Sequence, residues 1–530
     1  MVITIFDAMG IQEYLFGSNR LAENIGASYL VNQALNDWLL EAAIEAFPDK
    51  VNPSTQGFPA ATPGIFEEQH YDIELLYSAG GNAIFVCKDI DTARFFTGVY
   101  SRKLHERAPG LDVACYHHEL TTSFRLGEEI MNAMGEMAKN KNYRFSGTSL
   151  TGMGVTERCA SGNDETAITE DHTQKGRLIG PSALEKIKNR LQSRNHLNVF
   201  LKQEIPNDCE LPSELDRLGR SIGEKSFVGV CHIDGNGVGK ALQSLLFNQV
   251  SPNPAEQLLS IREFSKKITD AGAQAIRAVM EQVTRNWNPD EKKYATRLDP
   301  YVDANTYKAS LPFRPLVYGG DDITFVCDGR IALDLAATCL RTFASSEEFH
   351  ACAGVALVKS HYPFFRAYSL AEELCRNAKK AVQNSSSKHG SAMDWQIVSG
   401  GPLRSLDSWR EREYCIGANL LACRPYFVLP SNQRGLNNWD SFRDNLLCLQ
   451  GEKTTPECTD QWKQAHSRLK SLIPHLRGGP ATTELILKEW KQKGYHMPQY
   501  SGFDLSNGFY GNRTPFLDAL ELLDFLVPLE

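Results

Sequence analysis

The 13 cysteines of this sequence include no Cys-x-x-Cys pair. Such pairs are the usual sequence sign of a structural zinc site, so we expect no zinc. The number of cysteines is odd, and several lie inside apolar runs, as Cys87, Cys231 and Cys352 do. That distribution is typical of reduced thiols in a cytosol and argues against a disulfide framework.

Long apolar segments are also missing. No run approaches the ~20 residues that a membrane-spanning helix needs, and the first seven residues contain no basic residue, unlike a secretory signal peptide. Hydrophobic residues make up 42% of the sequence and charged residues 23%, as is ordinary for a globular protein. The length of 530 residues predicts more than one domain. We therefore expect a cytoplasmic protein without a membrane partner.

Basic residues are not in excess either, since the formal net charge is −8. Proteins that bind nucleic acid over a broad surface are usually basic, so any RNA contact would need a local patch. The most basic stretch is Lys175–His196. A solvated helix face is the simpler interpretation of this stretch, and an RNA-facing patch is the alternative.

The segment Leu316–Val326 consists of two apolar runs around a Gly-Gly-Asp-Asp turn. This pattern predicts a β-hairpin in which Gly319 and Gly320 form the turn. Asp321 and Asp322 would then begin the outgoing strand. Because strand side chains alternate between faces, we expect one of these acids to reach a metal from the sheet surface and the other to assist from the side.

A second acid ends the apolar run Phe227–Asp234, which a glycine-rich turn and a helix-like segment follow. Strand, glycine-rich turn and helix is the order that directs backbone N–H groups at phosphate oxygens. The amides expected to do so are those of Asn236, Gly237 and Val238. Gly319 and Gly320 of the hairpin turn are also expected to bind the nucleotide.

Each motif alone is common in ordinary loops, but the two together, both at strand ends, indicate a shared site. If the strands are neighbours, Asp234 and Asp321 meet at one end of the sheet. Carboxylates beside a phosphate-binding loop predict a site for two Mg²⁺ ions and for phosphoryl or nucleotidyl transfer. Asp322 would bind metal or orient Asp321, and the carbonyl of Gly235 would add a ligand.

On these motifs the chain resembles the large, double-palm subunit of type III CRISPR effector complexes, and the palm is similar to that of GGDEF-type diguanylate cyclases. The resemblance implies an enzyme of antiviral defence that converts ATP into cyclic oligoadenylates with Mg²⁺ or Mn²⁺. It also implies guide and target RNA and other effector subunits as partners. Many members begin with an HD nuclease domain, whereas this sequence begins with the first palm, so no such DNase activity is expected.

Two further positions are interpreted from the resemblance. In related palms a lysine near the end of a helix reaches the nucleotide triphosphate, and Lys379 matches that lysine. The family often carries a zinc-binding cysteine pair in the connecting region. This chain has Cys159 alone there, which again argues against zinc.

The chain also contains an internal repeat. Phe6-Asp7 ends the opening strand as Ile233-Asp234 ends its counterpart, and Gly80–Ile84 is matched to Gly319–Ile323. On this alignment Asn82 and Ala83 stand where the second copy has Asp321 and Asp322. We therefore expect the first copy to be a non-catalytic palm that supports the second.

The predicted fold class is α/β (α+β), with two ferredoxin-like palms. The expected domains are a degenerate palm over 1–125, a helical connecting region over 126–220, a catalytic palm over 221–400 and a helical domain over 401–530. Two other functions stay open on the sequence. One is a stand-alone palm-type cyclic nucleotide synthase, and the other is a non-enzymatic scaffold of a ribonucleoprotein. Clustered acids argue against the scaffold, since their mutual repulsion disfavours ionisation without a metal.

Overall fold

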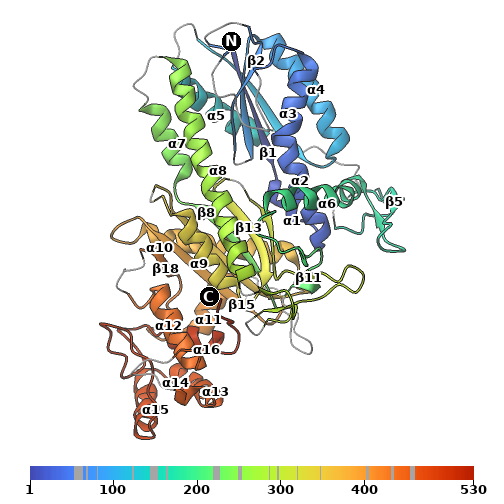
Figure 1. Cartoon of the computed structure of the whole chain (residues 1–530). Helices are drawn as coiled ribbons and strands as arrows, with labels where there is room; N and C mark the ends of the chain where they lie inside the picture. The colour runs from blue at the N-terminus through green and yellow to red at the C-terminus, as the bar shows by residue number, and fades with distance from the viewer. Residues whose placement is uncertain are drawn as a thin grey trace.

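A computed structural model describes residues 1–52, 64–66, 70–79, 81–121, 125–143, 153–162, 165–218, 227–248, 253–285, 287–294, 298–318, 320–346, 348–401, 405–430, 435–453 and 460–529. The molecule is elongated, with a first sheet near the N-terminus, a second sheet in the middle and a group of C-terminal helices at the far end (Figure 1). No helix among the described residues is long and apolar enough to cross a bilayer. The described cysteines are free thiols and most are buried.

The first sheet is antiparallel, with the strand order β2-β3-β1-β4. Its strands are β1 (Val2–Met9), β2 (Ile73–Ala79), β3 (Asn82–Cys87) and β4 (Asp112–Glu119). Phe6 and Phe85 pack on one face against α2 (Leu21–Leu35), α3 (Asp37–Ala46) and α4 (Ile90–Arg107), and the short helix α1 (Ile11–Phe16) precedes them. Helices α2 and α3 meet at Asn36.

The other face of the first sheet carries α5 (Leu126–Tyr143). Ile5 and Ile84 share a buried cluster with Ile130 and Met137 of this helix. We expected residues 126–143 to belong to the connecting region, but the apolar side of α5 packs on the first sheet. We call β1 to α5 the first unit.

The second sheet has the order β12-β13-β8-β14-β15-β18. Its strands are β8 (Phe227–Gly235), β12 (Phe313–Val317), β13 (Asp322–Asp328), β14 (Ala351–Lys359), β15 (Ser391–Val398) and β18 (Tyr426–Leu429). Cys231 and Ile233 pack with α8 (Pro254–Arg285) and α9 (Ala332–Phe343) on one face. Val228 and Val230 pack with α10 (Phe364–Gln383) on the other. We call β8 to α10 the second unit.

The two units repeat the same element order and the same four-strand pattern. Strands β2, β3, β1 and β4 correspond to β12, β13, β8 and β14, and α5 corresponds to α10. Both hairpins carry a register shift at the same place, between Leu75 and Tyr77 in one and between Pro315 and Val317 in the other. The repeat predicted from the sequence is thus present in the strand order of the described residues.

The register corrects our alignment of the two hairpins by one residue. Asp7 lies opposite Asn82, as Asp234 lies opposite Asp322. Asn82 therefore corresponds to Asp322, where our sequence alignment had Ala83. Gly81 corresponds to Asp321, where that alignment had Asn82. A shift of one residue moves a strand side chain to the other face of the sheet, so only the strand pairing could fix this correspondence.

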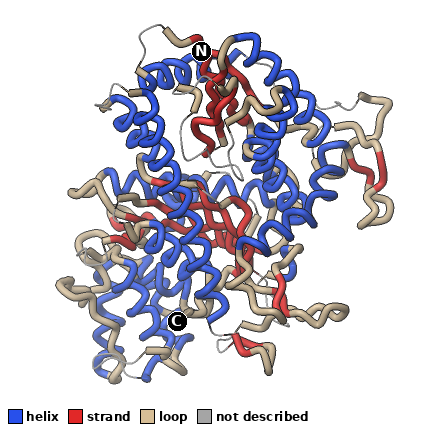
Figure 2. The backbone as a smooth tube through the Cα atoms, turned by 45° about the horizontal axis from the view of Figure 1, so that its top comes forward, coloured by secondary structure: helices blue, strands red, loops and turns tan. Residues whose placement is uncertain are grey.

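The two units also pack on each other. Figure 2 shows their sheets as separate groups of strands with helices between them. Helix α7 (Val238–Phe247) follows β8, yet its buried Leu246 belongs to the apolar cluster of the first unit. Arg262 of α8 pairs with Glu74 of β2 at 2.7 Å. On the opposite side Phe16 of α1 packs on Tyr368 of α10, with ring centroids 4.2 Å apart.

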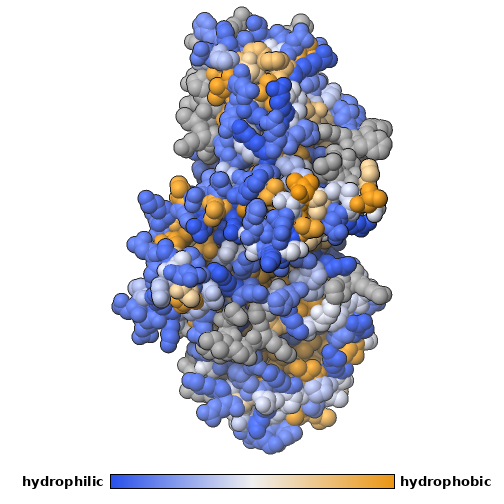
Figure 3. All heavy atoms as spheres, turned by 90° about the vertical axis from the view of Figure 1, so that its right-hand side faces the viewer, coloured by the Kyte–Doolittle hydropathy of each residue, from blue (hydrophilic) through white to orange (hydrophobic). Residues whose placement is uncertain are grey.

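The connecting region centres on α6 (Pro181–Phe200), which packs on α2. Lys175, Lys188 and Arg194 of the basic stretch are exposed, as expected for a solvated face, whereas Arg177 and Lys186 are internal. Arg177 pairs with Glu23 at 2.5 Å and with Asp171 at 2.7 Å, and Lys186 donates to the Tyr14 carbonyl at 2.7 Å. The surface on the right-hand side of Figure 1 is mostly hydrophilic, with apolar side chains in scattered groups (Figure 3).

The remaining elements are short strands and the C-terminal helices. The helices are α11 (Leu406–Tyr414), α12 (Trp439–Gln450), α13 (His466–Lys470), α14 (Leu472–Arg477), α15 (Pro480–Gln492) and α16 (Phe516–Leu522), with the 3₁₀ turns Leu215–Arg217 and Asp460–Trp462. The two-residue strands are β5 (Thr169–Glu170), β6 (Leu178–Ile179), β7 (Cys209–Glu210), β9 (Trp287–Asn288), β10 (Lys293–Tyr294), β11 (Ala309–Ser310), β16 (Cys415–Ile416) and β17 (Asn419–Leu420).

Candidate active site

Three acids meet where β8 ends and β13 begins. Asp322 lies directly opposite Asp234, on the face of the sheet that α10 covers. Asp321 precedes β13, and its carbonyl accepts the N–H of Gly235 at 3.0 Å. A Cβ atom on Gly235 would lie 2.8 Å from the Cβ of Asp321, so the glycine permits this close approach. The structure thus brings together the three predicted catalytic acids.

The charges of these acids work against one another. The pKa of Asp321 is raised, by burial first and then by the negative charge of Asp234. Burial also raises the pKa of Asp322, to about 6, although nearby His232 opposes that shift. About half of the Asp322 side chain is exposed (49%), but its Oδ1 is enclosed and has no hydrogen-bond partner among the described residues. Burial and the neighbouring acids therefore outweigh the influence of His232 on Asp322.

Lys379 of α10 reaches this site, but not in the position that we expected for a residue that binds phosphate. Its Nζ lies 2.6 Å from Asp234 Oδ2 and 2.8 Å from the carbonyl oxygen of Gly235. Gly354 of β14 makes this possible, because a Cβ atom there would lie 1.8 Å from the Ala371 carbonyl oxygen of α10. The helix can therefore lie close to the sheet and direct its C-terminal lysine at the end of β8.

The predicted phosphate loop is only partly available for phosphate. The N–H of Asn236 donates to the His350 carbonyl at 2.7 Å, and its Nδ2 donates to the Gly390 carbonyl at 3.0 Å, so this residue shapes the loop instead. Gly237 has φ +71° and caps the N-terminus of α7. The N–H groups of Gly237 and Val238 have no acceptor within the described part of the chain, as is usual for the first amides of a helix.

The turn of the second hairpin is held by a helix that the sequence analysis did not connect with it. Gly320 has φ +108°. A Cβ atom on Gly272 of α8 would lie 2.3 Å from the Gly320 carbonyl oxygen, so α8 touches the turn through a glycine. Gly319, which we also predicted to bind nucleotide, lies outside the described residues.

Two more residues near the acids were missed because nothing in the sequence places them there. Nδ1 of His232 lies 3.4 Å from Asp322 Oδ1 and 3.3 Å from Thr324 Oγ1. Tyr77 comes from β2 of the first unit, and its pKa is raised to about 12, by burial and by the charge of Asp321. The first unit therefore borders the acid cluster.

The donor set suits a hard divalent cation, which binds carboxylate and carbonyl oxygens. Oδ1 of Asp322 is enclosed and has no hydrogen-bond partner among the described residues, and this observation favours a cation here. As the side chains stand, no group of three or more His, Cys, Asp or Glu residues in the described ranges is arranged to chelate one. A cation would thus require side-chain movement, and Lys379 now contacts two of its expected ligands. The sulfur of Cys159 accepts the N–H groups of Ser161 and Gly180.

The first unit keeps part of the same arrangement. Lys141 of α5 pairs with Asp7, as Lys379 of α10 pairs with Asp234. Ala114 lies opposite Asp7, and Cys352 lies opposite Asp234. Lys141 follows Ala114 by the same number of residues as Lys379 follows Cys352, so the two lysines occupy corresponding positions. Asn82 stands opposite Asp7, and its buried Oδ1 is unpartnered within the described residues, like Oδ1 of Asp322. The first unit thus repeats the acid–lysine pair without the other two acids.

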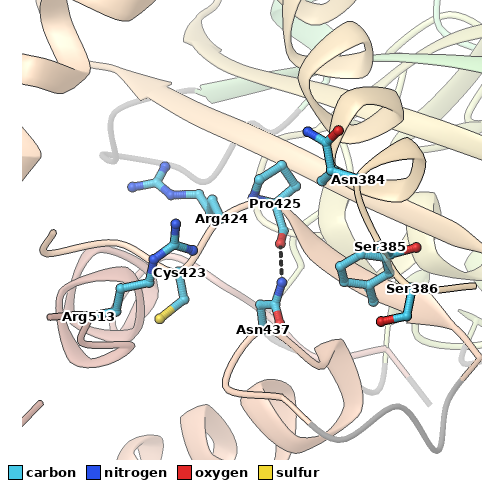
Figure 4. A pocket seen from close by; sticks show the side chains of 10 residues that line it. Asn384, Ser385, Ser386, Cys423, Arg424, Pro425, Asn437 and Arg513 are labelled. Carbon is cyan, nitrogen blue, oxygen red and sulfur yellow. Dashed lines mark hydrogen bonds between the residues drawn. The ribbon is translucent and has the colours of Figure 1, made fainter. Parts of the chain in front are cut away.

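A cavity of about 400 Å³ lies elsewhere, between the end of α10 and the segment before β18 (Figure 4). Asn384, Ser386, Pro425 and Arg513 are among the residues that line it. It contains none of the three acids. The acid cluster, at the ends of the interior strands β8 and β13, therefore lies outside this cavity.

No family model matches this sequence, and no curated protein matches it. Among solved structures, the chain is similar to Csm1 in T. onnurineus, with a TM-score of 0.55 and 12% identity over 98% of this chain and 69% of that chain. It is also similar to Csm1-Csm4 cassettes in complex with cA3 (TM-score 0.54, 12% identity, 98% and 69%) and with AMPPNP (TM-score 0.51, 13% identity, 98% and 69%). At these identities the likeness shows that the chain has the mixed α/β fold of Csm1.

Proposed function

We propose that this chain is a metal-dependent nucleotidyltransferase of the type III CRISPR large-subunit kind, which converts ATP into cyclic oligoadenylates. The single observation that carries the proposal is the meeting of Asp234, Asp321 and Asp322 beside the Gly235–Val238 loop. The Csm1 fold supports it, since structures of that fold are described in complex with cA3 and with AMPPNP.

The proposed reaction is attack of a ribose hydroxyl on the α-phosphate of ATP, with pyrophosphate leaving. The triphosphate would lie over the start of α7, where the amides of Gly237 and Val238 have no acceptor in the described structure and the helix dipole favours anions. Gly320 and Gly237 leave open space, since a Cβ atom on either would meet nothing within 4 Å. Lys379 would offset phosphate charge once it leaves Asp234.

Asp234, Asp321, Asp322 and the carbonyl of Gly235 would hold Mg²⁺ or Mn²⁺. The bound cation would supply the charge that activates the hydroxyl and balances the triphosphate. The role of the protein residues is to hold their oxygens together against mutual repulsion. The register of β8 and β13 does this for Asp234 and Asp322, and the Gly235–Asp321 contact does it for the third acid.

We further propose that the chain works with guide and target RNA and other effector subunits, since one described relative is a Csm1-Csm4 cassette. The first unit would support the second rather than catalyse, because Gly81 and Asn82 stand where Asp321 and Asp322 do. A stand-alone synthase of a cyclic nucleotide would use the same site without RNA.

Pyrophosphate release tests the reaction class. Protein purified together with its RNA and effector subunits is incubated with each of the four NTPs and Mg²⁺, beside Asp322→Asn and the matched first-unit change Asp7→Asn. We expect release from ATP by the wild type and by Asp7→Asn, and none by Asp322→Asn. Equal release by Asp322→Asn would exclude this site as the source.

A further inference from the structure

The ammonium group of Lys379 occupies the place where a divalent cation would be expected. It lies between the carboxylate of Asp234, at 2.6 Å, and the carbonyl of Gly235, at 2.8 Å. A carboxylate and a backbone carbonyl are also ligands that hard cations take. Two cations cannot share these two oxygens, so the lysine and a metal ion would exclude each other there.

The rest of the site is consistent with a missing charge. The single ammonium leaves Oδ1 of Asp322 enclosed and without a hydrogen-bond partner among the described residues. Of the three acids, Asp234 is the one that pairs with this ammonium.

Lys379 is also free to move away. About a fifth of its side chain is exposed (21%), as is about two fifths of that of Asp234 (40%). It lies in the last turn and a half of α10, and its flexible four-carbon stem ends in a compact charge. The Gly235–Val238 loop begins at the residue whose carbonyl the ammonium contacts. A phosphate bound to this loop would therefore be next to the present position of the ammonium.

We propose that Lys379 and the divalent cation exchange places. In the nucleotide-free chain the ammonium closes the metal position at Asp234 and Gly235. Binding of the cation displaces it, and the displaced ammonium then pairs with the triphosphate. The inference rests on the proposed function, because it assigns an order to metal and nucleotide binding at the same acids.

Exchange makes a prediction that a purely supporting salt bridge does not. Replacing the ammonium by an uncharged side chain removes a competitor of the metal and a ligand of the phosphate at once. The variant Lys379→Met should therefore bind Mn²⁺ more tightly, by about fivefold, which is the upper range for a half-exposed ion pair. It should bind AMPPNP more weakly in saturating Mg²⁺.

The repeat supplies a matched control. Lys141 forms the same kind of pair with Asp7, but Gly81 and Asn82 replace the other two acids there. Lys141→Met therefore removes an equivalent ion pair where no metal competes. Lys379→Arg keeps the charge and should stay close to the wild type in Mn²⁺ affinity.

The experiment measures free Mn²⁺ by electron paramagnetic resonance during titration of the full chain without nucleotide. AMPPNP binding is measured separately by calorimetry, and thermal melting shows that each variant is folded; Lys379→Gln replaces the methionine variant if that one is not. Tighter Mn²⁺ and weaker AMPPNP binding in Lys379→Met, with neither change in Lys141→Met, is the expected result. Unchanged or weaker Mn²⁺ affinity in Lys379→Met would overturn the exchange and leave the nucleotidyltransferase proposal standing. Absence of Mn²⁺ binding in every variant would overturn both.

Discussion

Asp322 of β13 lies directly opposite Asp234 of β8, in an antiparallel ladder whose register continues from Ile233 and Ile323 to Val228 and Asp328. Residues opposite one another in such a ladder have Cβ atoms about 4.5–5.5 Å apart, and like charges at that separation destabilise the sheet. The first unit has Asn82 opposite Asp7 and so avoids this repulsion. The second unit therefore accepts a local repulsion, which Lys379 reduces at Asp234 and which a bound cation would reduce further.

The first prediction concerns that cost. Because the folded-state pKa of Asp322 is raised from 3.8 to about 6, ionisation of this carboxyl destabilises the fold. The penalty is absent below about pH 3.8, grows between there and about pH 6, and is complete above it. Asp322→Asn should thus raise the melting temperature of the metal-free protein by about 1–3 °C at pH 7.5 and change it little at pH 4.

The reverse change provides the control for this prediction. Asn82→Asp places a second carboxylate opposite Asp7 in the first unit. It should lower the melting temperature at pH 7.5. A lower melting temperature for Asp322→Asn at pH 7.5 would show that the acid supports the metal-free fold instead of straining it.

The second prediction concerns the pH dependence of metal binding. A carboxyl group must lose its proton to bind Mn²⁺, so a site with a pKa of about 6 loses affinity as the pH falls below 6. We expect about a tenfold loss for each pH unit below that value. Calorimetric titrations with Mn²⁺ between pH 5 and pH 8 measure this directly. An affinity that is constant down to pH 5 would contradict a role for Asp322 as a ligand.

The third prediction concerns the glycine contact that holds the second hairpin. The Cβ atom of Gly272→Val would lie only 2.3 Å from the Gly320 carbonyl oxygen, so α8 or the turn must move. We expect a loss of stability of about 1–3 kcal/mol and loss of pyrophosphate release. Denaturant unfolding measures the first effect. Gly135→Ala on α5 is the matched control, since nothing lies within 4 Å of its Cβ, and it should gain about 0.5–1 kcal/mol.

The fourth prediction concerns α7, which directly follows the phosphate loop and packs on the first unit. Leu246 is buried in the cluster that Ile5 and Ile84 form. Leu246→Ala should cost about 2–5 kcal/mol of stability and raise the KM for ATP, because the amides of Gly237 and Val238 lose their anchor. Leu485→Ala, at a side chain that is 70% exposed, should do neither. An unchanged KM in folded Leu246→Ala would show that the loop does not depend on the first unit.

Much of the strand framework follows from the sequence. The strand that ends near Asp234 and the strand that Asp322 begins lie where predicted, because short apolar runs bounded by turn residues are a strong local signal. The repeat was also visible, since both units keep strand, helix, Gly-Gly hairpin, helix and strand in order. These features depend on residues close together in the chain.

What the sequence did not predict depends on contacts between distant residues. The correspondence of Asn82 with Asp322 is fixed by the pairing of β3 with β1. In the sequence, the two hairpins match almost equally well when one is shifted by one residue. Arg177 and Lys186 were interpreted as part of a basic surface, but Glu23 of α2 and the Tyr14 carbonyl of α1, with which they pair, lie 154 and 172 residues away in the chain. The pair that Lys379 forms with Asp234 was also not predicted, because it depends on the close contact of α10 with Gly354, while its role in binding phosphate stays a prediction.

Product analysis by mass spectrometry tests the central claim most directly. The full chain is incubated with ATP and Mg²⁺ or Mn²⁺, with and without co-purified RNA and subunits, beside Asp321→Ala/Asp322→Ala. We predict a cyclic oligoadenylate that the wild type forms in the RNA-containing preparation and the double variant does not. Formation by the chain alone would favour the stand-alone synthase. No cyclic product from folded protein with its natural partners and RNA present would contradict the proposed nucleotidyltransferase.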